Sequence, residues 1–372
     1  MAFEAKAHPK PLPSTAVTQG FESVAFPKLV RELHHSSELV IKQKALLALI
    51  DCLISPLKHT QCVAAGVTPR VVMLLQDADA LVRERAAIAL EKLALRELGT
   101  RDIIQHSGLK QLVNRLHDEE LRVREAVYRA LIEACRLEIA RVRMVELATA
   151  LPDLMALVLA EGVGIAVQGL MLLNAIVQVR NNGDALTQLI DRAKAVGSLS
   201  KLLAQGLPIP LQQQAAKLLA VLTTREEAKV QAVEVAAVPK LLALIDPNNP
   251  SELSRSAAAA IASISVCREG KYAIAATPGG LHILTALVSP GSDPNQCAYA
   301  LEAISNAAEA PEARKVLAAL GALDKCTEVY EKAESVSGRV GELLRRSAAE
   351  AIRQVGFAHL PHALLVSGAV GR

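Results

Sequence analysis

The sequence predicts an all-α solenoid, a stack of similar groups of helices. Within residues 81–95, small and apolar residues recur at helical spacing and share one face: Val82, Ala86, Ala89, Leu90 and Leu93. The same pattern then recurs at the pivot residues Ala45, Ala86, Val127, Leu172, Ala215, Ala257, Cys297 and Ala348, at steps of 41, 41, 45, 43, 42, 40 and 51 residues. Self-similarity with a period of about 40–47 residues is typical of stacked helical repeats.

The composition agrees with helices that pack through aliphatic and small side chains. Of the 372 residues, 51% are hydrophobic, yet the chain has only four tyrosines, four phenylalanines and no tryptophan. The aromatic residues that are enriched in β-strands are therefore scarce. The 41 basic and 38 acidic residues leave a formal net charge of +3, which is too balanced to attract nucleic acid through a general electrostatic field.

The ends of the predicted solenoid follow from the loss of the helical period. Residues 1–20 contain three prolines and no such period, which predicts a flexible tail. The first helix is expected to begin at Phe26, with Pro27 in its first turn, and the last to end near Phe357. Residues 358–372 are expected to form a loosely held tail. The longest interval between pivots predicts a loop around residues 331–341.

Each predicted repeat contains a short first helix, a second amphipathic helix and a long third helix with the pivot. A glycine or proline recurs near the start of the second helix, at Gly66, Gly108, Pro152, Gly197, Pro239, Gly279 and Gly321. Polar turns such as residues 76–79 and 246–250 separate the second and third helices. Three helices with this glycine favour armadillo over two-helix HEAT repeats. We therefore predict a right-handed armadillo solenoid of about eight three-helix repeats over residues 21–357.

One segment requires a test for membrane insertion. Residues 162–179 carry no charge over 18 positions, which is close to the length that spans a bilayer. The segment contains polar residues such as Asn174, however, and its pivot Leu172 is in phase with the other repeats. We interpret it as a buried helix of a central repeat and expect no membrane span. The N-terminus has no apolar region of the kind found in signal peptides, so none is expected.

Motifs that could carry chemistry are weak. Gly162-Val163-Gly164 lacks the preceding strand of a nucleotide-binding loop. The pairs His34-His35 and His359-x-x-His362 have no cysteine or carboxylate partner at ligand spacing. The six scattered cysteines form no C-x-x-C motif, which predicts free and mostly buried thiols. We expect no catalytic residue, no metal or other cofactor, and no small-molecule substrate.

The strongest positive feature is a basic residue three positions before the pivot. We call Lys42, Arg83, Arg124 and Arg345 the basic register. Residues at equivalent positions of stacked helices lie about 8–10 Å apart, so the first three are expected to form a short positive track. They could bind an extended acidic partner segment. The alternative is intramolecular pairing with Glu84, Glu125 or Asp79, and the sequence leaves both readings open.

The first repeat carries a resemblance to a known family. Residues 26–53, with Pro27-Lys28-Leu29 followed by KQKALLAL, resemble the opening of the armadillo-repeat radial spoke proteins of motile cilia, of the radial spoke head 14 homologue type. Shorter similarities lie at residues 268–272, 308–315 and 346–352. The resemblance extends over roughly residues 20–357.

The resemblance implies a function. It predicts a non-enzymatic scaffold subunit of the axonemal radial spoke that binds other radial spoke proteins and supports ciliary or flagellar motility. Such a protein would be in the cytoplasm during assembly and then in the axoneme. We expect no nucleic acid and no membrane as partners, because the charge is balanced and residues 162–179 are interpreted as a buried helix. The alternative function is a general cytosolic armadillo adaptor that binds an extended acidic peptide segment along the basic register.

Overall fold

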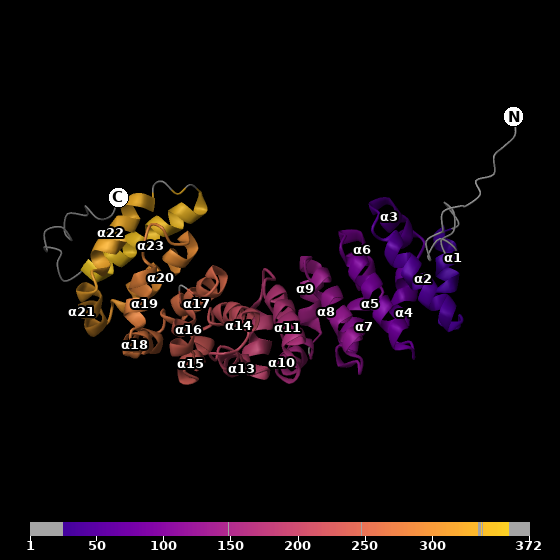
Figure 1. The fold of residues 1–372 in the computed structure, drawn as a ribbon, viewed down its shortest axis with the longest axis horizontal. Helices are drawn as coiled ribbons and strands as arrows, with labels where there is room; N and C mark the ends of the chain where they lie inside the picture. The colour runs from indigo at the N-terminus through magenta and orange to yellow at the C-terminus, as the bar shows by residue number, and fades with distance from the viewer. Residues whose placement is uncertain (1–24, 148, 247, 334–335, 337, 357–372) are drawn as a thin grey trace, which may run out of the picture. The chain divides into compact units, whose positions relative to one another are not determined.

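The protein is all-helical in the part of the chain that its structure describes. A computed structural model describes residues 25–147, 149–246, 248–333, 336 and 338–356, and no β-strand occurs within these ranges. The tails predicted at residues 1–20 and 358–372 lie outside the described residues. The helices follow one another in the colour order of Figure 1.

The chain divides into two compact units, Met1–Ala185 and Leu186–Arg372. Unit 1 contains four long helices: α2 (Leu39–Cys52), α5 (Ala80–Ala94), α8 (Leu121–Ala134) and α11 (Val163–Ile176). Unit 2 contains four more: α14 (Ile209–Leu222), α17 (Ser251–Ile264), α20 (Pro294–Ala307) and α23 (Arg339–Val355). Within each unit every long helix packs against the next one along the chain. These eight helices contain the eight pivot residues.

Shorter helices connect the long ones. The helices that precede each long helix are α1 (Ala25–Glu32), α4 (Val67–Leu74), α7 (Gly108–Asn114), α10 (Ala150–Ala160), α13 (Ala195–Leu202), α16 (Ala237–Leu244), α19 (Gly280–Leu287) and α22 (Ala322–Lys332). The helices that follow a long helix are α3 (Pro56–Ala64), α6 (Glu97–Gln105), α9 (Glu138–Glu146), α12 (Gly183–Thr187), α15 (Glu226–Glu234), α18 (Arg268–Ala276) and α21 (Pro311–Ala319). Short turns of other helix types, η2 (Arg115–His117) and η3 (Gln188–Arg192), extend α7 and α12.

Helix α5 shows why the sequence forms these elements. The Asp79 carboxylate accepts a hydrogen bond from the Val82 amide and caps the helix N-terminus. The predicted face, which includes Val82, Ala86 and Leu90, is completely buried. Alanine at the centre of this face lets α5 and α8 pack closely along their lengths.

The turn before the second helix adopts a left-handed backbone conformation in six places. Glycine occupies it at Gly66, Gly279 and Gly321, as predicted, with φ of 73°, 72° and 67°. Elsewhere the residue is Ser107, Lys194 or Ala236, with φ of 58°, 49° and 52°. The nearby Gly108 and Gly197 lie inside α7 and α13 instead. Gly108 is the first residue of α7 and Gly197 the third of α13, so both lie near the start of the second helix, as expected, without making the turn.

Replacing Ala236 with glycine is expected to raise the free energy of unfolding by about 0.5–1 kcal/mol. A left-handed conformation costs an L-residue about 1–2 kcal/mol, and glycine avoids most of this cost. The same exchange at Ala273, inside α18, should instead destabilise the protein by about 1 kcal/mol, because glycine weakens a helix interior. Urea denaturation followed by circular dichroism measures both. Equal losses at the two positions would show that Ala236 is unstrained.

Two further expectations can be compared with the structure. The loop expected around residues 331–341 overlaps the segment between α22, which ends at Lys332, and α23, which begins at Arg339, but this segment is no longer than the one between α19 and α20. The last interval is long partly because α22 and α23 have 11 and 17 residues, whereas α19 and α20 have 8 and 14. Among the described residues, no helix is both long and apolar enough to cross a membrane.

Candidate functional site

Three residues of the basic register lie in unit 1, each in the first turns of a long helix. Lys42, Arg83 and Arg124 belong to α2, α5 and α8. Because these helices pack side by side, the equivalent positions follow one another across the unit, as the 41-residue spacing predicts.

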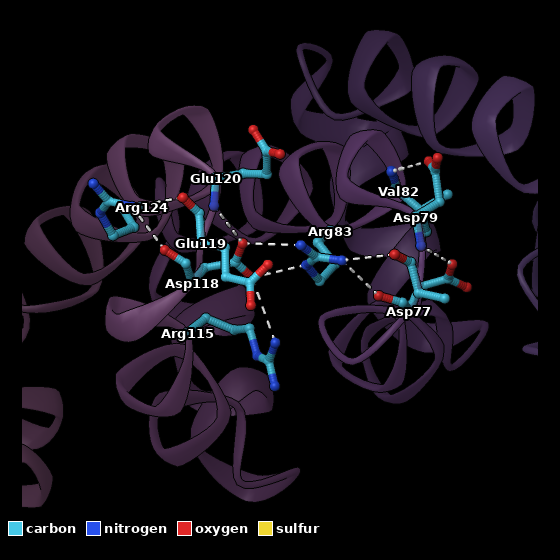
Figure 2. Close-up of polar contacts among 10 residues, drawn as sticks. Asp77, Asp79, Val82, Arg83, Arg115, Asp118, Glu119, Glu120 and Arg124 are labelled. Carbon is cyan, nitrogen blue, oxygen red and sulfur yellow. Dashed lines mark hydrogen bonds and ion pairs between the residues drawn. The ribbon is translucent and has the colours of Figure 1, made fainter.

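Arg83 joins two repeats. Its Nε and second guanidinium nitrogen donate to the two carboxylate oxygens of Asp118, at 2.7 and 2.9 Å. Its remaining nitrogen donates to the carbonyl oxygens of Asp77 and Ala78, at 3.0 and 2.9 Å. Figure 2 shows Arg83 between these two groups of acceptors. One side chain thus holds the turn before its own helix and the turn before the next long helix.

Lys42 and Arg124 repeat this arrangement on either side of Arg83. The Lys42 ammonium pairs with Asp77, and both side chains are at most 10% exposed. Arg124 donates to the carbonyl oxygens of Asp118 and Glu119, at 2.7 and 3.0 Å, and pairs with Glu161 at 2.8 Å. The three cations therefore form a ladder of internal ion pairs, which we call the unit 1 ladder.

Asp118 is the most enclosed acidic group of the ladder, since its side chain is only 1% exposed. Burial alone would raise the pKa of this carboxyl. The hydrogen bonds from Arg83, the Glu120 amide and Arg115 outweigh burial and hold the pKa below its ordinary value. The same pair raises the pKa of the Arg83 guanidinium, chiefly through the hydrogen bond to Asp118. Both partners are therefore charged at neutral pH.

The Asp118 carboxylate is expected to stabilise the protein at neutral pH and to stop doing so in acid. A carboxyl whose pKa is lowered by folding contributes stability above its unfolded pKa of about 3.9, and this contribution is lost as the pH falls through the lower folded value. The difference in melting temperature between the wild type and Asp118→Asn should be constant from about pH 7 to pH 5 and shrink below about pH 4. A difference that persists in strong acid would contradict an ionic role.

The fourth residue of the basic register lies in unit 2 and has other contacts. Arg345 is exposed on α23, and its guanidinium carbon lies 5.5 Å from the centre of the Tyr330 ring. The four intervening repeats have Gly169, Gln212, Ser254 and Pro294 at this position. Gln212 donates to the carbonyl oxygen of Ala204, at 2.7 Å. It holds the turn before its own helix as Arg83 does, but without a charge.

The geometry favours the intramolecular reading of Lys42, Arg83 and Arg124, although the acceptors differ from those expected. Glu84, Glu125 and Asp79 were the predicted partners, whereas Asp77, Asp118 and Glu161 accept the ion pairs. These acceptors recur at steps of 41 and 43 residues. This acidic period runs parallel to the basic one and could have identified them from sequence. Binding of a partner by the basic register stays a prediction.

The other chemical candidates form no site in the described part of the chain. No group of three or more His, Cys, Asp or Glu side chains there could hold a metal ion. His34 Nδ1 lies 2.7 Å from Ser36 Oγ, and the His34 and His35 rings contact each other; His359 and His362 lie outside the described residues. All six cysteines are free and buried, as predicted. Burial raises the pKa of the Cys62 and Cys135 thiols to about 12, so both are protonated and unreactive.

Sequence reasoning missed a groove of about 570 Å³ in unit 2. We call it the unit 2 groove; it runs across the long helices α17, α20 and α23, beside the end of α14. Its lining contains small residues, namely Ala220, Ala259, Ala262, Ser263, Ser305 and Ser347, together with Val221, Thr224, Val266, Tyr299, Asn306 and the acids Glu302 and Glu350. Small residues leave room for a backbone to approach the helices. The lining contains no lysine or arginine.

The two carboxylates of the groove lining differ in whether a cation pairs with them. Glu350 pairs with Arg353 and also accepts a hydrogen bond from Gln354 at 3.2 Å, and its pKa is lowered mainly by Arg353. Glu302 accepts a hydrogen bond from Ser347 Oγ at 3.4 Å. Burial raises the pKa of Glu302, and the Ser347 bond and the charge of Arg346 offset this only in part. No cation of the described residues lies within ion-pairing distance of Glu302.

The chain is similar to another protein over nearly its whole length. It is 48% identical over 372 residues to a protein of Chlamydomonas reinhardtii described as Radial spoke protein 14. The alignment covers 98% of this chain and 94% of that protein. No protein-family model matches the chain.

A solved structure supports the fold. An engineered protein superimposes with a TM-score of 0.62, over 92% of this chain and 93% of that one, at 22% sequence identity. At this level of identity the similarity concerns the helical architecture alone.

Proposed function

This chain belongs to the radial spoke protein 14 family, and we propose that it is a non-enzymatic scaffold subunit of the radial spoke in the ciliary or flagellar axoneme. The identity of 48% over nearly the full length of both proteins carries the proposal. In this role the protein binds other radial spoke proteins and supports motility, and it is in the cytoplasm before assembly.

The architecture suits such a scaffold. We infer that the groups of three helices are armadillo repeats, about eight in number, in a right-handed solenoid over residues 21–357. The recurring left-handed turn before the second helix supports this inference, as do the eight long helices with their pivots. Solenoids offer extended surfaces to partners instead of a closed catalytic pocket.

The alternative function, an adaptor for an acidic peptide, has less support. It requires Lys42, Arg83 and Arg124 to be available to a partner, whereas each already pairs with an internal carboxylate. In the proposal these three residues keep the repeats of unit 1 in register. Arg345 is exposed and is the member of the basic register that a partner could reach most easily.

Fractionation of ciliated cells that express the tagged protein tests the proposal. We expect the protein to remain with detergent-extracted axonemes and to co-purify with radial spoke proteins after the spokes are released by salt. A tagged cytosolic protein of similar size serves as the control for trapping. Recovery only in the soluble cell-body fraction would refute the proposal.

A further inference from the structure

The unit 2 groove contains a carboxylate, Glu302, that forms no ion pair with the described residues, although the nearby charge of Arg346 lowers its pKa slightly against the effect of burial. Glu302 lies on α20 and is partly buried in the groove. Moving a carboxylate out of water costs free energy unless a cation or several hydrogen bonds compensate. The single hydrogen bond from Ser347, at 3.4 Å, is long and supplies little compensation.

Unit 1 shows how a carboxylate on one long helix is neutralised when the next long helix supplies a cation. Glu91 lies five positions after the pivot Ala86 and pairs at 3.1 Å with Arg129, which lies two positions after the pivot of the next repeat. In unit 2 the residue equivalent to Arg129 is Glu350, two positions after Ala348. The long helix after α20 therefore offers an acid to the groove lining and no base, and Arg353 of the same helix neutralises that acid.

We propose that the unit 2 groove binds a partner segment that carries a lysine or arginine, and that this side chain pairs with Glu302 as Arg129 pairs with Glu91. The inference deepens the scaffold function proposed above and rests on it. Charge complementarity selects the partner, because the lining holds two acids and no base. The small side chains of Ala259, Ala262 and Ser263 let the segment approach α17, while Tyr299 and Val266 offer apolar contact.

The groove also has a property expected of a binding site that is incomplete without its partner. Because the pKa of Glu302 is raised by burial, its ionised form destabilises the free protein at neutral pH. Replacing Glu302 with glutamine should therefore leave the melting temperature unchanged or raise it. A residue needed only for folding would give the opposite result.

Selection of peptides from a random library on the purified full-length protein tests the proposal. We expect the wild type to select peptides enriched in lysine or arginine. Glu302→Gln should weaken their binding about tenfold, which corresponds to about 1.4 kcal/mol. Glu302→Arg should abolish the preference for basic residues. Glu312→Gln is the matched control, since Glu312 is exposed on α21, pairs with Lys315 and lies outside the groove.

A second variant tests the place of binding. Ala259→Arg adds a positive charge to the groove lining, and this charge repels a basic segment. The exchange should abolish binding while the circular dichroism spectrum remains unchanged, because arginine is a good helix former. Selected peptides without basic residues, or no selected peptides at all, would overturn the proposal. Self-association of the protein that is lost in the Glu302→Gln variant would also overturn the proposal, because a second copy of this chain would then occupy the groove. A protein that joins axonemes normally but shows no such peptide preference retains the proposed function and loses this inference.

Discussion

Replacing Arg83 with methionine is expected to lower the free energy of unfolding by about 3 kcal/mol. Methionine keeps the volume and apolar stem of the side chain but removes both hydrogen bonds to Asp118, at 2.7 and 2.9 Å. The Asp118 carboxylate, with its side chain 1% exposed, would remain charged and buried without its main partner. Breaking such a pair costs more than the pair itself contributes, because desolvation of the remaining charge is no longer compensated.

The pair of Arg101 and Glu97 in α6 provides the control. Its nitrogen–oxygen distance is also 2.7 Å, but the two side chains are 58% and 60% exposed. Arg101→Met should therefore change stability by less than about 0.5 kcal/mol. Urea denaturation measures both variants, and amide hydrogen exchange in α5 and α8 locates the loss. Adding Asp118→Asn to Arg83→Met should recover part of it, since the unpaired charge is then absent; equal small effects at Arg83 and Arg101 would contradict a buried clamp.

Replacing Gly99 with alanine is expected to destabilise the protein by about 3 kcal/mol, at the upper end of the usual cost of overpacking. Gly99 is buried in α6, and a Cβ atom there would lie 2.1 Å from the carbonyl oxygen of Leu93 and 2.9 Å from the His59 ring. His59 itself lies 2.9 Å from the same carbonyl oxygen, through Nε2. The helix must move away from the end of α5 to accept a methyl group, and this movement disturbs that contact.

Replacing Gly164 with alanine is expected to stabilise the protein instead of destabilising it. Gly164 lies in the first turn of α11, where an added Cβ atom meets nothing within 4 Å. Alanine should stabilise the helix there by about 0.5 kcal/mol, because it restricts the unfolded chain. Thermal denaturation of the two variants gives the comparison. A stabilised Gly99→Ala variant would show that α6 is free to shift and that the close approach is not required.

In most of the helices that follow a long helix, the third residue is alanine or glycine, and the repeat period does not predict which. Ala140, Ala228 and Ala313 occupy the third position of α9, α15 and α21, where Gly99 and Gly270 stand in α6 and α18. All five are buried. The repeat pattern indicates that a small residue belongs there. Only the distance between the first helix and the preceding long helix decides whether a methyl group fits.

By itself the sequence determined the helical class, the period and the faces of the long helices. The predicted helix at residues 81–95 is α5 at Ala80–Ala94, and its expected apolar face is buried. These features are local: a helix places residues three and four positions apart on one face whatever surrounds it. The basic register was also visible, because four of the eight repeats carry a basic residue at the same offset from the pivot.

Only the tertiary structure decided what the charged residues do. Stacking brings Arg83 to Asp118 and Arg124 to Glu161, which are 35 and 37 positions apart along the chain, and no rule of local spacing selects these acceptors over Glu84 or Glu125. The same holds for Glu302, whose sequence neighbours do not reveal that it lacks an ion pair within the described part of the chain. Whether a charge is neutralised depends on distances and burial across neighbouring repeats. These quantities cannot be read from the period of the sequence.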